Sequence, residues 1–298
     1  MPDKTAAAEA PAARRKKRSQ WQDVVYRFKK SKLAVIGVAM LAALILVTVI
    51  SGFFINYEVD VIKQNVTQKL LPPSLDHPFG TDHYGRDLLA RILYGARYSL
   101  SIGVVVIFFA LGGGLVIGSV AGYFGGRADN ILMRVVDMFI AMPPTLFAIA
   151  VVSALGPGIV NLSIAIILAY IPAYARIMRS TVLSVKDMDY VEAARAQGAG
   201  HLRIIAKHIL PSALPPLIVQ ATLGVGYVIL QASALSFLGL GIMPPDPEWG
   251  AILSEGGRFM RQSPWMVIFS GAAIIYVVIS LNIIGDGLRD ALDPKMKD

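Results

Sequence analysis

The chain has 298 residues, of which 55% are hydrophobic and only 16% are charged, and its formal net charge is +8. A soluble domain carries roughly a quarter charged residues. This composition therefore excludes an ordinary soluble protein, and the long uncharged runs in which the apolar residues stand indicate a membrane protein. The sequence contains no cysteine, which excludes a disulfide framework, a thiolate zinc site and a cysteine nucleophile.

A basic segment, residues 1–33, precedes the first apolar run. Its Lys and Arg residues are concentrated between Arg14 and Lys32. Nucleic-acid binding is one interpretation of such charge, but a cytoplasmic anchor beside a membrane span explains its position better. The apolar run 34–54 that follows is 21 residues long, which is too long for the core of a cleavable signal peptide. We therefore expect residues 34–56 to form the first transmembrane helix.

In all, six segments are apolar over about the 20 residues needed to cross roughly 30 Å of hydrocarbon. They are residues 34–56, 99–123, 133–155, 159–176, 214–236 and 266–286. The third is expected to kink at Pro143 and Pro144, because proline interrupts helical hydrogen bonding. A tight turn at 156–158, of sequence Gly-Pro-Gly, separates it from the fourth. The predicted fold class is an all-α integral membrane protein with six transmembrane helices, in which residues 99–286 form a five-helix core.

The second span carries glycine at every fourth position, at Gly114, Gly118 and Gly122. Residues four apart lie on one face of a helix. Small side chains on that face allow the backbone of a neighbouring helix to approach closely. We interpret this stripe as a place of tight helix packing within the chain.

The distribution of positive charge indicates the orientation of the spans. Most of the 28 Lys and Arg residues lie in four segments that would share one side, namely 1–33, 124–134, the loop 177–213 and the tail 287–298. The positive-inside rule then places both termini in the cytoplasm and leaves segments 57–98 and 237–265 outside. Asp137 and Asp286 lie near cytoplasmic ends, and the middle of the spans is nearly free of ionisable groups. This disfavours an ion-coupled carrier or channel, which stays the alternative from a different functional class.

The outer segment 57–98 gathers side chains that suggest a metal site or local polar contacts. The candidate ligands are Asp76, His77, Asp82, His83 and Asp87. We favour local contacts, in which Thr81 or Asp82 caps a helix that lies along the membrane interface. The apolar face of that helix would be Leu88, Leu89, Ile92 and Leu93.

Two further pairs resemble functional sites. His201 and His208 are seven residues apart, which places them on one helical face, but two histidines alone are a weak metal signature. Asp246 and Glu248 suggest paired carboxylates for hydrolysis. Because prolines flank them and no nucleophile or base accompanies them, we expect them to shape the outer loop or to meet an external partner.

A polar insert, residues 190–211, interrupts the apolar second half of the chain between the fourth and fifth spans. Asp189 followed by Glu192 matches a capping box, so residues 190–197 are expected to form a short helix. Gly198 can take the left-handed conformation that ends a helix. A second helix is expected after it, with Leu202, Ile205 and Ile209 on one face and Pro211 at its end.

Three interpretations of the insert compete. A DNA-reading helix-turn-helix has this shape, but beside a bilayer it would have little freedom to reach a groove. An inert connector is possible, although a loop of this length is uncommon. The third is a rigid knob for a cytoplasmic partner, since the small residues Ala193, Ala194 and Ala196 permit close approach.

The stretch EAARAQG followed by ILP resembles the EAA loop of the membrane subunits of bacterial ABC importers. The matching residues are Glu192, Ala193, Ala194, Gly198, Leu210 and Pro211, while His208 stands where the usual pattern has isoleucine. Residues 79–100, 236–253 and 282–295 resemble the C-type permease of dipeptide, oligopeptide and nickel importers. From about residue 20 to its end, the chain is similar to that family.

This resemblance implies the permease subunit of an ATP-driven importer of short peptides in the bacterial cytoplasmic membrane. A nickel-chelate or glutathione importer is the alternative within the family. The implied partners are a second, related permease, two ATPase subunits and an external solute-binding protein. The resemblance implies no catalytic, cofactor or metal residue here: the sequence has no phosphate-binding loop motif, so ATP and Mg would bind the ATPase subunits. The implied ATPase-docking residues are Tyr190, Glu192, Ala193, Ala194, Arg195, Gly198, Leu210 and Pro211.

Overall fold

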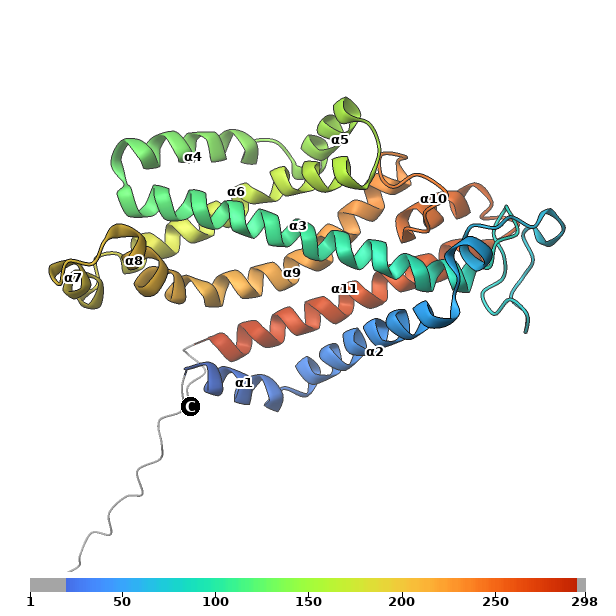
Figure 1. Ribbon diagram of the computed structural model, residues 1–298, viewed down its shortest axis with the longest axis horizontal. Helices are drawn as coiled ribbons and strands as arrows, with labels where there is room; N and C mark the ends of the chain where they lie inside the picture. Colours follow the sequence, from blue (N-terminus) through green and yellow to red (C-terminus); the bar gives the residue numbers. More distant parts are fainter. Residues whose placement is uncertain (1–19, 294–298) are drawn as a thin grey trace, which may run out of the picture.

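The computed structural model describes residues 20–293, which are almost entirely helical (Figure 1). The outermost parts of the basic segment and of the C-terminal tail therefore lie outside the described residues. The α-helices are α1 (Gln20–Lys30), α2 (Lys32–Phe54), α3 (Leu88–Phe124), α4 (Gly126–Ile140), α5 (Pro144–Leu155), α6 (Ile159–Val185), α7 (Asp189–Ala196), α8 (His201–Ile204), α9 (Leu210–Phe237), α10 (Trp249–Arg258) and α11 (Pro264–Leu292). Short turns add η1 (Tyr57–Val61), η2 (Val66–Gln68) and η3 (Ile205–Ile209).

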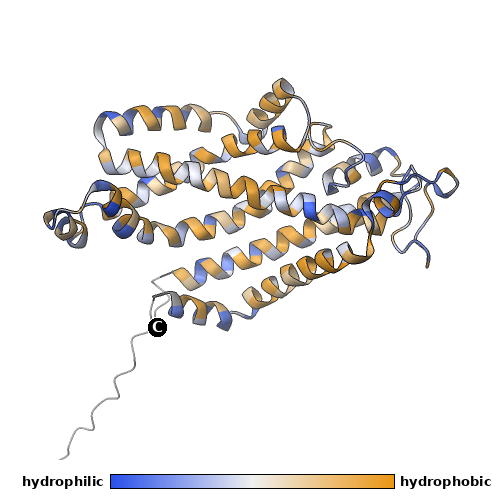
Figure 2. Ribbon diagram, in the orientation of Figure 1, coloured by the Kyte–Doolittle hydropathy of each residue, from blue (hydrophilic) through white to orange (hydrophobic). Residues whose placement is uncertain are grey.

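Five helical stretches in the described part of the chain are long and apolar enough to cross a membrane. They are α2, α3, α6, α11 and the unit His201–Phe237, in which α8, η3 and α9 follow one another. Figure 2 shows their apolar residues along the length of the bundle. Three of them extend well beyond the predicted limits: α3 begins at Leu88, α6 continues to Val185 and α11 to Leu292. An apolar run marks only the part of a helix inside the hydrocarbon. The helix itself continues until a stop signal, such as a C-terminal glycine or a following proline, ends it.

The third predicted span, residues 133–155, is not one kinked helix. It is divided between α4 and α5, whose axes differ by 87°, so the pair is either a broken span or a re-entrant loop. Pro143 adopts an extended conformation (φ −54°, ψ 129°) just before Pro144 begins α5. Proline disfavours helical geometry in the residue before it, which explains a break instead of a kink. Six spans result if the bent pair counts as one.

The expected interfacial helix of the outer segment is wrong as a separate element. Asp87, rather than Thr81 or Asp82, is the N-cap, and its Oδ1 accepts a hydrogen bond from the amide of Ala90 at 2.8 Å. From Leu88 the helix continues without interruption to Phe124 as α3. No proline divides this stretch, so the predicted interfacial turns are the first turns of the second span.

The glycine stripe of α3 packs against α6, as its spacing predicts. A Cβ added at Gly114, Gly118 or Gly122 would overlap Tyr174, Met178 or Val182. On the other side of the bundle α2 packs along α11 (Figure 1). The close contact between α3 and α6 is the most extensive helix–helix contact of the bundle.

The two ends of the bundle carry different elements (Figure 1). One end, here named the α7 end, carries α1, α7, α8 and the last described residues of α11. The opposite end, named the α10 end, carries α10 and residues 57–87. Both described chain ends therefore lie at the α7 end.

Candidate functional site

The short helix α7 projects beyond the bundle at the α7 end (Figure 1). Its bounds, Asp189–Ala196, confirm the prediction of a helix over residues 190–197 within one residue. The predicted capping box is wrong, because the N-cap is Met188, and its side chain makes no capping hydrogen bond. Asp189 and Glu192 instead occupy the first turn, where carboxylates interact favourably with the positive end of the helix dipole.

Gly198 ends α7 in the left-handed conformation that its sequence position predicts, with φ +80°. Its amide donates to the carbonyl of Arg195 at 3.0 Å, and the amide of Ala199 donates to the carbonyl of Ala194 at 3.1 Å. These two bonds form a Schellman motif. No atom lies within 4 Å of a Cβ added at Gly198, so the backbone conformation, and not space, requires glycine here.

One face of α7 is anchored in the protein core. Val191 is fully buried and Ala194 is 9% exposed. Val191 belongs to the same hydrophobic cluster as Val185 at the end of α6 and Ile204 and Ile209 before α9. Ala194 therefore lies on the anchored face, whereas Ala193 and Ala196 are exposed.

The opposite face of α7 is open. We define the α7 surface as the exposed residues Met188, Tyr190, Glu192, Ala193, Arg195 and Leu202. It includes large apolar side chains at the tip of the molecule, since Leu202 is 84% and Met188 49% exposed. Apolar groups that gather on a protruding polar segment are typical of a protein contact.

The prediction that Leu202, Ile205 and Ile209 share one face of the second helix needs correction. Leu202 points outward and Ile205 is only half-buried, while Ile204 and Ile209 face the core. The reason is the π turn η3, in which the amide of Leu210 bonds the carbonyl of Ile205. The extra residue in this turn changes the helical register, which a regular 3.6-residue period cannot anticipate.

Pro211 does not end the second helix, contrary to the prediction. It lies in the first turn of α9, and the chain stays helical from His201 to Phe237. The adjoining π turn relaxes the clash that a proline ring makes with the preceding helical turn. Leu210 is half-buried, and Tyr190 of α7 reaches Ser212 next to Pro211, with hydroxyl oxygens 3.4 Å apart. Leu210 and Pro211 thus belong to the start of α9, which the Tyr190–Ser212 contact links to α7.

The two histidines of this region are separate. The Nδ1 atom of His201 lies 2.9 Å from the hydroxyl of Tyr123 on α3, and the rings are in edge contact. His208 is half-buried in the π turn. His201 of α8 therefore ties the turn after α7 to α3.

At the α10 end, the side chains that the sequence suggested as metal ligands bond to one another and to residues that were not predicted to join them. Asp87 bonds His77 at 2.7 Å, and the Nε of Arg86 donates to Asp82 at 2.6 Å. Arg86 also donates to Glu255 of α10 at 3.1 Å. In residues 20–293 no group of three or more such side chains is placed to hold a metal ion. Local polar contacts are the observed arrangement.

Arg91 and Glu255 are the missed members of this network. Arg91 is completely buried, with its guanidinium 3.4 Å from Asp82 and 3.6 Å from Glu255. Beside them, burial lowers the pKa of His83, while Glu255 opposes this shift. The signal in the sequence was a lone arginine in an apolar helix start, which requires a buried partner.

Asp246 and Glu248 shape the outer loop, as expected. Asp246 accepts hydrogen bonds from the hydroxyls of Tyr57 at 2.7 Å and Tyr98 at 3.0 Å. Burial, together with the bond to Asp246, raises the pKa of Tyr57 above its usual range. Glu248 caps α10 by accepting from the amides of residues 250 and 251, both at 2.9 Å. Both carboxylates are thus engaged in local structure.

Comparison with known families gives two matches, which lie on either side of residues 74–113. The family model described as binding-protein-dependent transport system inner membrane component matches residues 114–298. A second, described as the N-terminal transmembrane domain of oligopeptide transport permease C, matches residues 19–73.

Individual relatives match over most of their length. The dipeptide transport system permease protein of Alkalihalophilus pseudofirmus is 45% identical over 279 residues, which are 94% of this chain and 91% of that protein. That of Haemophilus influenzae is 39% identical over 282 residues, 93% of this chain and 95% of the relative. A glutathione transport system permease protein of Escherichia coli is 40% identical and covers 94% of this chain and 92% of its own length. Among solved structures, the MetNI methionine ABC transporter in an inward-facing conformation shares the fold, with a TM-score of 0.56 and 20% sequence identity. The match covers 69% of this chain and 98% of the matched chain.

Proposed function

Since this chain belongs to the family of binding-protein-dependent transport system inner membrane components, we propose that it is the permease subunit of an ATP-driven importer of short peptides. The observation that carries this proposal is its near full-length similarity to two dipeptide permeases, at 45% and 39% identity. The resemblance first drawn from the EAA loop is thereby confirmed. A glutathione permease at 40% identity keeps a modified tripeptide as the second candidate solute.

The chain is a multi-pass membrane subunit and performs no catalysis of its own. Importers of this family combine permeases with ATPase subunits and a solute-binding protein. For this chain we propose a heterodimer with a second, related permease, served by two ATPase subunits. ATP and Mg would bind those subunits, because this sequence has no phosphate-binding loop motif of its own.

The proposed orientation has the α7 end in the cytoplasm. The α7 end carries the basic loop 177–213. Most of the other basic segments lie at this end or are continuous with it, which agrees with the positive-inside rule. The inner membrane of a bacterium, with both termini cytoplasmic, is the location that this distribution supports.

Within this orientation the α7 surface is the proposed ATPase-docking site. Tyr190, Glu192, Ala193 and Arg195 are exposed and available for contact. Ala194 anchors the helix, and Gly198 fixes its end. The Tyr190–Ser212 contact, beside Leu210 and Pro211 at the start of α9, would pass a displacement of α7 to α9. Because Val191 of α7 is buried in one hydrophobic cluster with residues of α6 and α9, closure of the ATPases would move α7 with the spans as a rigid body.

The test is uptake of a labelled dipeptide by the complete complex in proteoliposomes. We expect uptake to require ATP and to stop when the catalytic residues of both ATPase subunits are replaced. The control is a complex with intact ATPases and unchanged solute-binding protein. Uptake that continues with inactive ATPases would contradict the proposal and support an ion-coupled carrier or a channel.

A further inference from the structure

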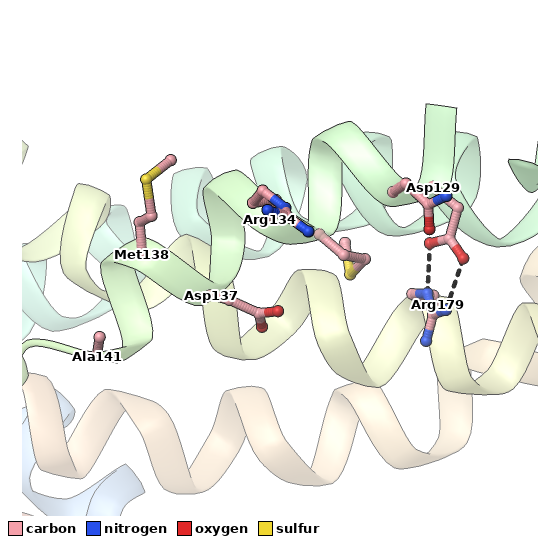
Figure 3. Close-up of a pocket in the computed structure, with 8 residues that line it drawn as sticks. Asp129, Arg134, Asp137, Met138, Ala141 and Arg179 are labelled. Atoms are coloured by element: carbon pink, nitrogen blue, oxygen red, sulfur yellow. Dashed lines mark hydrogen bonds and ion pairs between the residues drawn. The ribbon is translucent and has the colours of Figure 1, made fainter. Parts of the chain in front are cut away.

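Arg97 of α3 differs from the other arginines of α3 and α6, since no carboxylate within residues 20–293 pairs with it. The other three form ion pairs: Arg91, Arg176 and Arg179. Figure 3 shows one such pair, in which Arg179 bonds Asp129. Arg97 is exposed instead. A charge on a membrane-spanning helix needs a counterion or water, so the surroundings of Arg97 decide what it binds.

The guanidinium of Arg97 is held in a notch at the junction of α2 and α3. Its Nη2 atom lies 3.5 Å from the carbonyl oxygen of Thr48 on α2. A Cβ added at Gly52, one turn farther along α2, would overlap this guanidinium, so the missing side chain leaves the notch open. On the other side, Cζ lies 4.8 Å from the ring centroid of Tyr94, in a cation–π contact. These contacts fix the position of the charge.

The notch lies at the edge of the apolar part of the bundle. Helix α2 has 23 residues and is therefore about 35 Å long, close to the roughly 30 Å thickness of the hydrocarbon. Gly52 precedes its last residue, Phe54, by two positions, or about 3 Å along the axis. Lipid headgroups begin where the hydrocarbon ends, and tyrosine is typical of this level. The guanidinium thus lies at the depth of lipid phosphate, at the α10 end of the bundle.

Beyond Arg97, toward the middle of the membrane, the same face of α3 is apolar. The residues that follow at intervals of four, three and four are Ser101, Val104 and Phe108, so all lie on one helix face. The Ser101 hydroxyl donates to the carbonyl of Tyr98 at 3.0 Å and is thus used within the helix. Val104 is 58% and Phe108 69% exposed. From Arg97 to Phe108 the helix rises about 16 Å, which is about half the thickness of the hydrocarbon.

A phospholipid matches this order of groups. A guanidinium carries five N–H donors, of which the Thr48 carbonyl uses one. Arginine binds phosphate through paired hydrogen bonds, and the anion also compensates its charge, which water does not. An acyl chain suits the apolar face that follows. A soluble anion would leave that face uncovered.

We propose that Arg97 binds the phosphodiester of a glycerophospholipid in the membrane leaflet at the α10 end, with one acyl chain along Val104 and Phe108. The lipid is the counterion that the described part of the chain does not supply. It lies at the junction of α2 and α3 and so contacts both helices. The site does not depend on which solute the complex carries.

The test titrates the purified full-length chain, in a neutral detergent, with dioleoylphosphatidylglycerol and reads the bound lipid by native mass spectrometry. Arg97→Gln should weaken the tightest binding at least about fivefold, because a charge-assisted hydrogen bond to phosphate is lost. Arg258→Gln removes the same charge at an exposed position of α10 and should leave binding unchanged.

A second variant keeps the charge and moves it. Gly52→Ala displaces the guanidinium from its notch and should weaken binding at least about twofold, since the paired geometry with phosphate is disturbed. The matched control is Gly271→Ala in α11, where an added Cβ meets only Leu253 at 3.6 Å, an ordinary contact. Dioleoylglycerol, which has the same acyl chains and no phosphate, should bind more weakly and equally to the unchanged chain and to Arg97→Gln. Excess inorganic phosphate should not displace the lipid.

Several results would overturn the inference. Unchanged lipid binding by Arg97→Gln or Gly52→Ala would show that the phosphate lies elsewhere, and an equal loss in Arg258→Gln would reflect net charge alone. Displacement by inorganic phosphate would indicate a site for a free anion. The titration is repeated on the assembled complex: if Arg97→Gln weakens binding only in the isolated chain, a neighbouring subunit covers this face instead of lipid.

Discussion

The guanidinium of Arg179 on α6 donates two parallel hydrogen bonds to the carboxylate of Asp129 on α4, Nε to Oδ1 at 2.5 Å and Nη2 to Oδ2 at 2.6 Å. Val136 is the buried residue of α4, so this helix has little apolar attachment to the bundle. The bidentate pair therefore fixes α4 to α6, the helix that leads directly into α7.

We predict that Arg179→Lys weakens this attachment, because lysine cannot reproduce the paired geometry of a guanidinium. Loss of a charge-assisted hydrogen bond costs about 1.5–3 kcal/mol, and partial exposure of Arg179 reduces that cost. The melting temperature of the purified chain in detergent should fall, and Asp129→Asn should add little in the double variant. Fully additive losses would show that the two residues act separately.

Gly198→Ala should disturb the end of α7 without creating a clash. A left-handed conformation costs a residue with a Cβ about 1–2 kcal/mol. We expect dipeptide uptake by the complex to fall severalfold, and Gly198→Pro to abolish it, since proline cannot adopt a positive φ. The matched control is Gly200→Ala, where φ is −68° and space is also open. Equal effects of the two alanine variants would contradict the Schellman-cap explanation.

Glu192→Lys should separate docking from folding. Glu192 is exposed on the α7 surface, so the chain should insert and accumulate normally while ATP-driven uptake is lost. The measurement is recovery of the ATPase subunits with a tagged permease, together with uptake. Glu58→Lys makes the same change at an exposed position of the α10 end and should leave ATPase recovery unchanged. Normal recovery and uptake for the Glu192 variant would contradict the docking role.

The buried network at the α10 end should be sensitive to loss of one charge. Glu255→Gln leaves Arg86 and Arg91 with Asp82 as their remaining carboxylate. Removing one partner of a buried ionic group typically costs about 3–5 kcal/mol. We expect a clear fall in melting temperature, whereas Arg258→Gln, at an exposed position of the same helix, should have little effect. A similar, small change in both variants would mean that the network does not stabilise the fold.

Acid should destabilise the α10 end through His83. Burial lowers the pKa of His83 below its ordinary value of about 6.5, and this outweighs the nearby carboxylates of Glu255 and Asp82. The unfolded chain then binds the proton more readily, so stability falls as pH decreases from about 6.5 toward the folded pKa. Melting temperatures measured from pH 7.5 to 5.5 should show this slope, and His83→Gln should reduce it. An unchanged slope would assign the pH effect to other groups.

Local sequence signals predicted much of α7. The helix itself and the left-handed Gly198 follow from a few neighbouring residues, and both are observed. The faces of the segment were predicted less well. Leu202 is exposed and Ala194 buried because a π turn and the packing of α6 and α9 set the register, and these depend on residues distant in the chain.

The sequence by itself determined the membrane character, the approximate spans and the family, because transfer of apolar residues from water to lipid is a sum over neighbouring positions. Only the tertiary structure decided which charges meet. Arg86 and Glu255 are 169 residues apart, yet their side chains bond in the same buried network. Asp137 and Arg176 likewise come together only because α4 packs beside α6. Pairing depends on the geometry of the whole bundle, since electrostatic interactions decay with distance in space and not along the chain.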